Sequence, residues 1–359
     1  MRQDTYIGAS DIKSVPPFYP LDRTFKVIEN ISADVLSERL TKCIRIFSLE
    51  ANWDVNNPTR LCCSTNNFLK FEINVWKHDF KNTTSKKSIE KEATTQNDES
   101  NVILEIRRHD GDCVRFHRLR TALFKFLQDT DESNNYEEGL NEHNNNHNMS
   151  RVIKKSHVIP PLRPLALDNL VNVLNSVAMS YELIFNGNTV DTLTGLKMLI
   201  FLTDATSIHR VYAAHVSDFI LLGYDAFGNN VPAVRDVIYN YVVNERDCIE
   251  HQYALQILAN SFQNSSLQQD ILTNAQLGTE MWNAVLPSLI LDIEDAEKSP
   301  HIAYNAIKCI RSWYSLAGVQ ADKTYNTQIL SSLQKALSFG EQFYSSLVTE
   351  SNDLKKALM

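Results

Sequence analysis

The stretch Val102–Leu127, VILEIRRHDGDCVRFHRLRTALFKFL, decides the fold of the first part of this chain. Its opening residues are apolar at every second position, which predicts a β-strand with one buried face. These residues are Val102, Leu104 and Ile106. Val114 and Phe116 alternate in the same way beyond Gly111. We therefore predict two strands joined by a tight turn, in which the glycine takes a positive φ at no steric cost.

The length of that turn follows from the residues that would pair across it. A two-residue turn would place the charged Arg107 opposite the apolar Val114. A three-residue loop, residues 109–111, instead pairs Ile106 with Val114 and keeps both on the buried face. A helix is predicted directly after the second strand, because apolar residues recur at spacings of three and four. These residues are Leu119, Ala122, Leu123, Phe126 and Leu127.

The residues before this stretch complete one α+β domain. Alternating apolar residues predict three further strands, over residues 24–31, 60–65 and 68–80. Ser32 is a good helix N-cap, so a helix should follow the first strand. The polar residues 81–101 have no apolar period and predict a disordered insertion. Residues 22–128 are therefore expected to form one antiparallel sheet with two helices on one face.

The rest of the chain has a different pattern. Residues 1–21 predict a flexible lead-in, and residues 129–164, which are acidic, Asn-rich and then Pro-rich, predict a disordered linker. From residue 165 to residue 359, helical segments follow one another. Three of them are similar and apolar almost all round: residues 194–208, 253–267 and 305–319. Helices that are covered by neighbours on both sides predict an all-α solenoid.

Composition and charge limit the functions open to the chain. It has 359 residues and a net charge of −8, yet residues 22–128 carry 18 Lys and Arg against 15 Asp and Glu, a net of +3. An acidic chain with one mildly basic part argues against nucleic-acid binding. No apolar run approaches the roughly 20 residues of a membrane helix, and the first residues lack the apolar core of a signal peptide. We expect a cytoplasmic protein, with peripheral membrane association as an open alternative.

No catalytic motif is present in the sequence. It contains no Gly-rich phosphate loop, no His-Arg-Asp or Asp-Phe-Gly motif of a kinase, and no Gly-x-Ser-x-Gly nucleophile. The neighbouring carboxylates Asp292, Glu294, Asp295 and Glu297 could serve acid–base or metal chemistry. Such a group at the end of a helix is more often a solvated turn. We therefore expect no enzymatic activity, no metal and no cofactor.

Residues 24–128 resemble the kinase-associated-1 domain, an α+β module found at the C-terminal end of microtubule-affinity-regulating and related kinases. The resemblance rests on three stretches: FKVIENISADVLSERLTKCI, LCCSTNNFLKFEINVW and EIRRHDGDCVRFHRLRTALFKFL. It implies binding of anionic phospholipid headgroups. In this family a basic pair before a turn glycine belongs to the lipid surface in some members, and here that pair is Arg107 and Arg108.

Three further basic residues join this pair as candidate headgroup contacts: Arg115, Lys70 and Lys77. Strand alternation sends Arg107 and Arg108 to opposite faces of the sheet, with Arg115 beside Arg107. The alternative, a solvated strand face on which Glu105 and Asp112 pair with the arginines, stays open.

Residues 165–350 resemble armadillo- and HEAT-type helical repeats, through segments such as HQYALQILANSF and HIAYNAIKCIRSWYSL. In such repeats an inner helix lines a groove in which an asparagine often contacts the partner's backbone. The resemblance makes Asn260 the candidate groove contact. The family's Trp-x-x-x-Asn spacing is absent from residues 165–350.

These expectations combine into a non-catalytic adaptor or scaffold. The helical domain would bind a protein partner, and the small domain would add a weak contact with an anionic lipid surface or a second protein. A different class stays open, a regulatory C-terminal portion of a serine/threonine kinase signalling system, since the resembled domain follows a kinase in its family. A cryptic enzyme is the third and disfavoured class.

Overall fold

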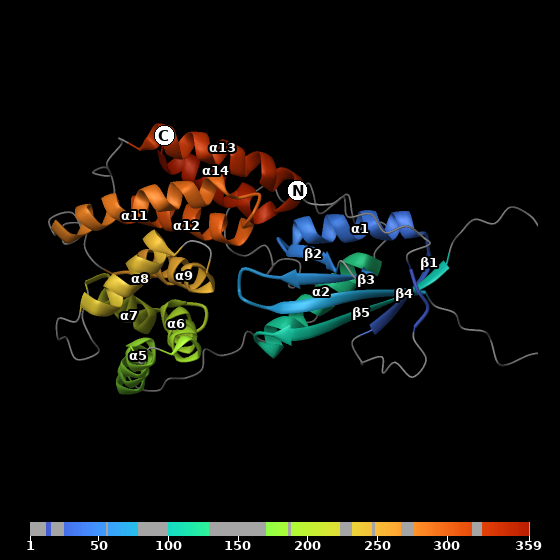
Figure 1. Ribbon diagram of the computed structural model, residues 1–359, viewed down its shortest axis with the longest axis horizontal. Coiled ribbons are helices and arrows are strands. Elements are labelled where there is room, and N and C mark those ends of the chain that lie inside the picture. Colours follow the sequence, from blue (N-terminus) through green and yellow to red (C-terminus); the bar gives the residue numbers. More distant parts are fainter. Residues whose placement is uncertain are drawn as a thin grey trace, which may run out of the picture. The chain divides into compact units, whose positions relative to one another are not determined.

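An antiparallel sheet of five strands organises the N-terminal part of the computed structural model (Figure 1). The elements follow one another as one strand, one helix, four strands and one helix, the predicted order of types, although one of the four strands is not the one predicted. Their bounds are β1 (Phe25–Ile31), α1 (Ala33–Ile46), β2 (Glu50–Asp54), β3 (Asn57–Ser64), β4 (Lys70–Lys77), β5 (Ser100–Asp110) and α2 (Cys113–Gln128). Neighbouring strands are all antiparallel, and their order across the sheet is β1-β5-β4-β3-β2.

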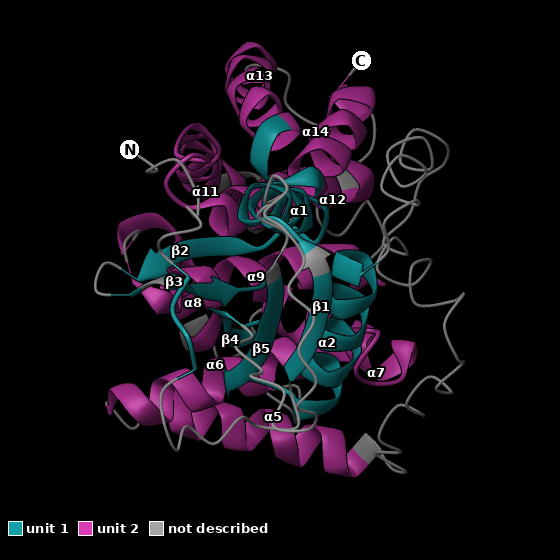
Figure 2. Ribbon diagram, turned by 90° about the vertical axis from the view of Figure 1, so that its right-hand side faces the viewer, with its two compact units in different colours: residues 1–158, 342–345 teal, residues 159–341, 346–359 magenta. Residues whose placement is uncertain are grey.

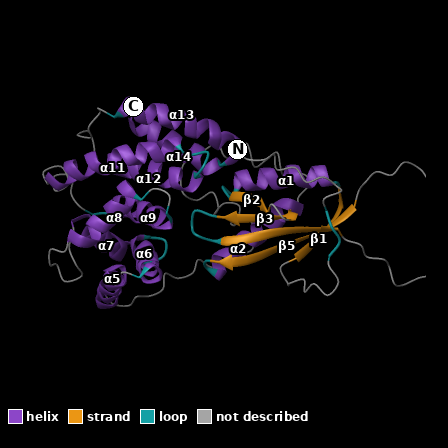
Figure 3. Ribbon diagram, viewed as in Figure 1, coloured by secondary structure: helices purple, strands orange, loops and turns teal. Residues whose placement is uncertain are grey.

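The structure describes residues 12–15, 25–54, 57–77, 100–128, 170–185, 188–222, 232–245, 248–266, 276–317 and 325–358. The chain divides into unit 1, residues 1–158 with 342–345, and unit 2, residues 159–341 with 346–359 (Figure 2). The five-stranded sheet belongs to unit 1, and the described part of unit 2 is mostly helical (Figure 3). No described helix is long and apolar enough to cross a membrane. The predicted linker and most of the predicted lead-in and insertion lie outside the described residues.

The second strand of the predicted hairpin is wrong, because residues 113–128 form α2. Gly111 does take a positive φ, of 95°, but at a turn from strand to helix. The side chain of Asp112 accepts a hydrogen bond from the Arg115 N–H at 2.6 Å and so satisfies an otherwise unpaired donor in the first turn of the helix. The missing strand is β2, which pairs with β3.

Both helices cover one face of the sheet, as predicted. The buried core contains Phe71, Ile73 and Val75 of β4 together with residues of both helices. From α1 these are Leu36, Leu40 and Cys43, and from α2 they are Leu119, Leu123 and Leu127. The predicted N-cap of α1 is confirmed, since the Ser32 side chain accepts from the Val35 N–H. With this layer in place, the opposite face of the sheet is left to the alternate residues of each strand.

The described helices of unit 2 agree in place with the predicted helical segments. They are α5 (Leu170–Phe185), α6 (Thr189–Thr203), α7 (Arg210–Leu222), α8 (Pro232–Asn244), α9 (Ile249–Asn264), α11 (Gln276–Glu294), α12 (Pro300–Ala317), α13 (Asn326–Phe343) and α14 (Ser345–Leu358). The last described part of the chain is divided between α13 and α14. Pro287 lies inside α11, which begins at Gln276.

Helix α9 is the centre of unit 2. It packs against α6, α7, α8 and α12, and every residue from Tyr253 to Phe262 is buried. Phe262 contacts the stacked rings of Trp282 and Trp313, whose centroids are 4.7 Å apart. The apolar pattern all round this helix, seen in the sequence, is therefore explained by neighbours on several sides. A regular superhelical repeat stays a prediction.

Candidate functional site

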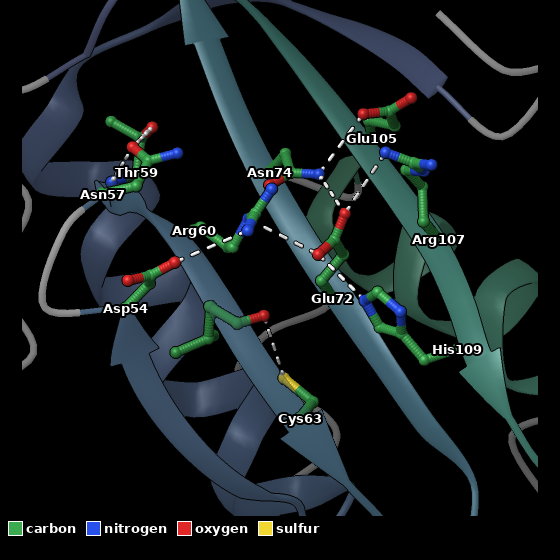
Figure 4. Close-up of polar contacts among 11 residues, drawn as sticks. Asp54, Asn57, Thr59, Arg60, Cys63, Glu72, Asn74, Glu105, Arg107 and His109 are labelled. Carbon is green, nitrogen blue, oxygen red and sulfur yellow. Dashed lines mark hydrogen bonds and ion pairs between the residues drawn. The ribbon is translucent and has the colours of Figure 1, made fainter.

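Six polar side chains from three strands meet on the sheet face opposite the helices (Figure 4). They are Arg60 of β3, Glu72 and Asn74 of β4, and Glu105, Arg107 and His109 of β5, and we call them the sheet-face cluster. The strand register brings them together, because it pairs Asn74 with both Arg60 and Glu105, and Glu72 with Arg107. Paired residues of antiparallel strands present their side chains on the same face.

Glu72 is the hub of this cluster, with a side chain only 3% exposed. Its carboxylate lies 2.9 Å from His109 Nε2, 3.4 Å from Arg60 Nε and 3.5 Å from an Arg107 nitrogen. Asn74 donates its amide to Glu72 at 3.0 Å. Burial by itself raises the pKa of Glu72, but the bonds from Asn74 and His109 and the charges of Arg60 and His109 outweigh it, so the net pKa is lowered.

The charges in the sheet-face cluster are internally balanced. Asn74 also donates to the fully buried Glu105 at 3.3 Å, and Arg60 contacts Asp54 of β2 at 3.5 Å. The two arginines are thus surrounded by three carboxylates, which leaves little positive field for an outside anion. The expected pairing of Glu105 with Arg115 is wrong, since Arg115 belongs to α2. The sequence does contain a pattern that indicates this cluster, because polar residues occupy alternate positions of β4 and β5.

The five predicted headgroup contacts do not form one patch. Arg107 points to Glu72 on the open face, whereas Arg108, exposed, donates to the Gly111 carbonyl at 2.6 Å. This confirms that the two arginines face opposite ways. Lys70 and Lys77 are exposed at opposite ends of β4, roughly 23 Å apart at the usual rise per residue. The five residues therefore cannot contact one headgroup together, and their individual contacts with lipid stay a prediction.

A second group of basic residues lies on α2. This helix carries Arg115, Arg118, Arg120 and Lys125 and contains no Asp or Glu. All four side chains are half-buried. They flank the apolar side of the helix, which faces the sheet. Arg120 contacts His117 at 3.0 Å. We call these four residues the α2 basic face, although Arg120 lies on the opposite flank of the helix from Arg118 and Lys125.

In unit 2 a row of polar contacts crosses three neighbouring helices. Lys197 of α6 lies over the ring of Tyr253 of α9, 5.8 Å from its centroid. Further along the same side of α9, the side-chain amide of Asn264 donates to the Thr203 carbonyl of α6 at 2.8 Å. Between them, Asn260 links both neighbouring helices, as described next. We call this set the polar row: Lys197, Thr203, Tyr253, Asn260, Asn264 and Lys308.

Asn260, the predicted groove contact, is 4% exposed. Its amide lies 3.4 Å from Thr203 Oγ1, and its carbonyl accepts from Lys308 Nζ of α12 at 3.2 Å. Burial lowers the pKa of Lys308, while the charges of Glu350 and Asp204 oppose that change. Beyond Lys308, Arg311 pairs with Glu350 of α14. Asn260 therefore connects Thr203 of α6 with Lys308 of α12 inside the helical unit. A direct contact of Asn260 with a partner stays a prediction.

The carboxylates near the end of α11 do not act as one group. Asp292 is 2% exposed and contacts His251, so its interpretation as part of a solvated turn is wrong. Glu294 and Asp295 instead pair with the exposed lysines Lys335 and Lys298. Among the described residues no group of three or more His, Cys, Asp and Glu side chains is placed to hold a metal ion.

No family model, no curated protein and no solved structure matches the chain. The functional assignment accordingly depends on the geometry of these surfaces.

Proposed function

We propose that the protein is a non-catalytic adaptor whose helical unit binds an extended acidic segment of a protein partner along the polar row. The observation that supports this most directly is the continuous run of contacts from α6 through α9 to α12. Such a run holds side chains of three helices at fixed spacing. Preorganised side chains lose less conformational entropy on binding than free ones.

The chemistry of the row suits an acidic, extended segment. Its positive groups are the exposed Lys197 and the half-buried Lys308, with the half-buried Arg311 next to it on α12. Asn264, also half-buried, carries an amide of the kind that pairs with peptide backbone. Phe201 of α6 is 37% exposed and offers an apolar anchor four residues from Lys197. An aromatic anchor beside charged groups is the usual composition of an energetically important contact.

The proposal is tested by quantitative affinity capture with the full chain and two variants. Lys197→Glu with Phe201→Glu reverses an exposed charge of the row and removes the exposed apolar anchor beside it. Lys298→Glu is the matched control, since it reverses an exposed lysine outside the row. Proteins that are captured by the wild type and the control but lost from the double variant would support the proposal. Identical capture by all three chains would refute it.

A second candidate, anionic-lipid binding by unit 1, is favoured by the α2 basic face. Basic residues near an anionic membrane contribute about 1 kcal/mol each, so four of them would give weak, salt-sensitive binding. Co-sedimentation of the full chain with neutral and phosphatidylserine-containing vesicles would measure it. Arg115→Glu with Arg120→Glu should abolish the difference in pelleting between the two kinds of vesicle. Arg107→Glu should not, because Arg107 is paired with Glu72. Equal pelleting on both vesicles would contradict lipid binding.

A further inference from the structure

The ammonium group of Lys308 on α12 has no paired anion in the part of the chain that the structure describes. Its side chain is half-buried and donates one hydrogen bond, at 3.2 Å, to the uncharged Oδ1 atom of Asn260. No carboxylate of the described residues forms an ion pair with it. A protonated lysine carries three N–H donors and no acceptor. Two donors of Lys308 are therefore left for an anion from outside.

The carboxylates whose charges act on Lys308 are already engaged. Burial lowers the pKa of Lys308, and the charges of Glu350 and Asp204 oppose that change without reversing it. Glu350 pairs with Arg311. Asp204 accepts hydrogen bonds from the backbone N–H and the hydroxyl of Thr206, at 2.8 and 2.7 Å. Neither carboxylate is free to neutralise Lys308, and a partly buried ammonium is stabilised by an anion placed directly against it.

Gln256 of α9 carries a hydrogen-bond acceptor that also lacks a partner. The residue is 8% exposed, and its Oε1 atom is buried without a hydrogen bond to any described residue. Gln256 precedes Asn260 by four residues, so the two side chains lie one turn apart on the same side of α9. An unused acceptor and an unused cation thus lie on either side of Asn260, which contacts Lys308 directly.

We propose that Lys308 and Gln256 form a site that selects an acidic residue in the segment bound along the polar row. Lys308 donates to the carboxylate of an Asp or Glu side chain, and Gln256 accepts from a backbone N–H of the same segment. About two residues of an extended chain, which rises about 3.3 Å per residue, span the roughly 6 Å that separate positions four apart on a helix. One peptide segment can therefore supply both groups.

The ligand group is a carboxylate because the site offers one free cation. A phosphate would bring up to about two negative charges and three acceptor oxygens to that single ammonium. It would also place charge near the acceptor Oε1 of Gln256. The inference rests on the proposed function, since it names the kind of residue that the polar row selects and the two side chains that select it.

Fluorescence anisotropy of the full chain with a labelled polyglutamate peptide tests the role of Lys308. The wild type should bind this peptide more tightly than a neutral peptide of equal length, and Lys308→Met should weaken binding at least about tenfold. Lys335→Met, at a lysine 63% exposed, is the matched control and should bind like the wild type. A wild type without preference for polyglutamate, or a Lys308→Met chain that binds as well as the control, would overturn the site.

Gln256→Leu separates a role in binding from a role in folding, because leucine is similar in size and has no polar atom. Binding of polyglutamate should weaken by about threefold or more, the effect of one lost hydrogen bond. The unfolding free energy of the free protein, measured by urea denaturation, should not fall, because no hydrogen bond within the described chain is lost. Unchanged affinity, or a loss of stability, would overturn the role of Gln256.

The site and the proposed function fail in different ways. Polyglutamate binding that is lost in Lys197→Glu with Phe201→Glu but kept in Lys308→Met would retain the polar row as the binding surface and overturn the Lys308 site. Identical protein capture by the wild type and the double variant would refute the binding surface itself. A phosphoserine peptide that binds more tightly than polyglutamate of equal length would overturn the choice of a carboxylate.

Discussion

The Nε2 atom of His251 lies 3.1 Å from Asp292 Oδ2, and the two side chains are 0% and 2% exposed. The other ring nitrogen, Nδ1, lies 2.8 Å from the Tyr241 carbonyl, which can only accept, so Nδ1 carries a proton. A bond between Nε2 and Asp292 then needs one further proton, on the imidazole or on the carboxyl. This buried pair ties α9 to α11 in the centre of unit 2.

That geometry predicts different outcomes for two substitutions at residue 292. In Asp292→Asn, the amide can donate to a neutral imidazole, so the unfolding free energy should change by less than about 1 kcal/mol. Asp292→Leu leaves Nε2 buried without a partner and should cost about 2 kcal/mol. Urea denaturation measures both. Equal loss of stability in the two variants would show that the hydrogen bond does not contribute.

The lowered pKa of Glu72 predicts how unit 1 responds to acid. Because the folded pKa lies below the ordinary value of 4.5, the unfolded state takes up the proton first as pH falls. The stability that Glu72 contributes is therefore complete above pH 4.5 and is lost as pH falls through the folded pKa. Glu72→Gln should lower stability at neutral pH and flatten this acid dependence.

The matched control for Glu72 is Glu38→Gln on α1, whose carboxylate is 66% exposed in a pair with Lys42. A surface pair of this kind contributes little to stability. The stability of Glu38→Gln should therefore fall with acid in the same way as that of the wild type. Thermal denaturation between pH 3 and 7, about the range over which carboxylates titrate, compares the three chains. Parallel curves for the wild type and Glu72→Gln would contradict the hub assignment.

The lowered pKa of Lys308 predicts an effect at alkaline pH. Its folded pKa lies below the ordinary 10.5, so the unfolded state binds the proton more strongly and stability rises as pH increases toward 10.5. Relative to Lys308→Met, the wild type should thus gain stability as pH rises toward 10.5. Taking the difference between two chains cancels the titration of other groups. Lys335→Met, at a lysine 63% exposed, should show no such trend.

Gly111 predicts a specific cost at the turn between β5 and α2. An added Cβ would lie 2.7 Å from Leu69 Cδ2 and 2.8 Å from the Phe68 carbonyl oxygen, and the φ of 95° is unfavourable for any other residue. Gly111→Ala should lower the unfolding free energy by at least about 1 kcal/mol. Cys113→Ala, at an exposed position two residues on, should stay within about 0.5 kcal/mol. Urea denaturation measures the unfolding free energy of both variants. A Gly111→Ala chain that is as stable as Cys113→Ala would contradict the prediction.

Local patterns in the sequence identified much of unit 1. Ser32 began a helix because its hydroxyl can bond its own neighbours, and that bond requires no distant residue. The strand at residues 68–80 was visible because alternation reports one buried face. By contrast β2, with the sequence EANWD, alternates too weakly to be found, and only its pairing with β3 makes it a strand.

The sequence by itself determined that Gly111 lies at a turn, that the helix around residues 253–262 is surrounded, and that a basic stretch lies near Gly111. Only the tertiary structure decided that Val114 and Phe116 belong to a helix, because alternate apolar residues fit the first turn of an amphipathic helix as well as a short strand. It also decided that Arg107 pairs with Glu72 and that Asn260 and Asp292 are buried. These are outcomes of register and packing between segments far apart in the chain, and their energies depend on neighbours that no local pattern specifies.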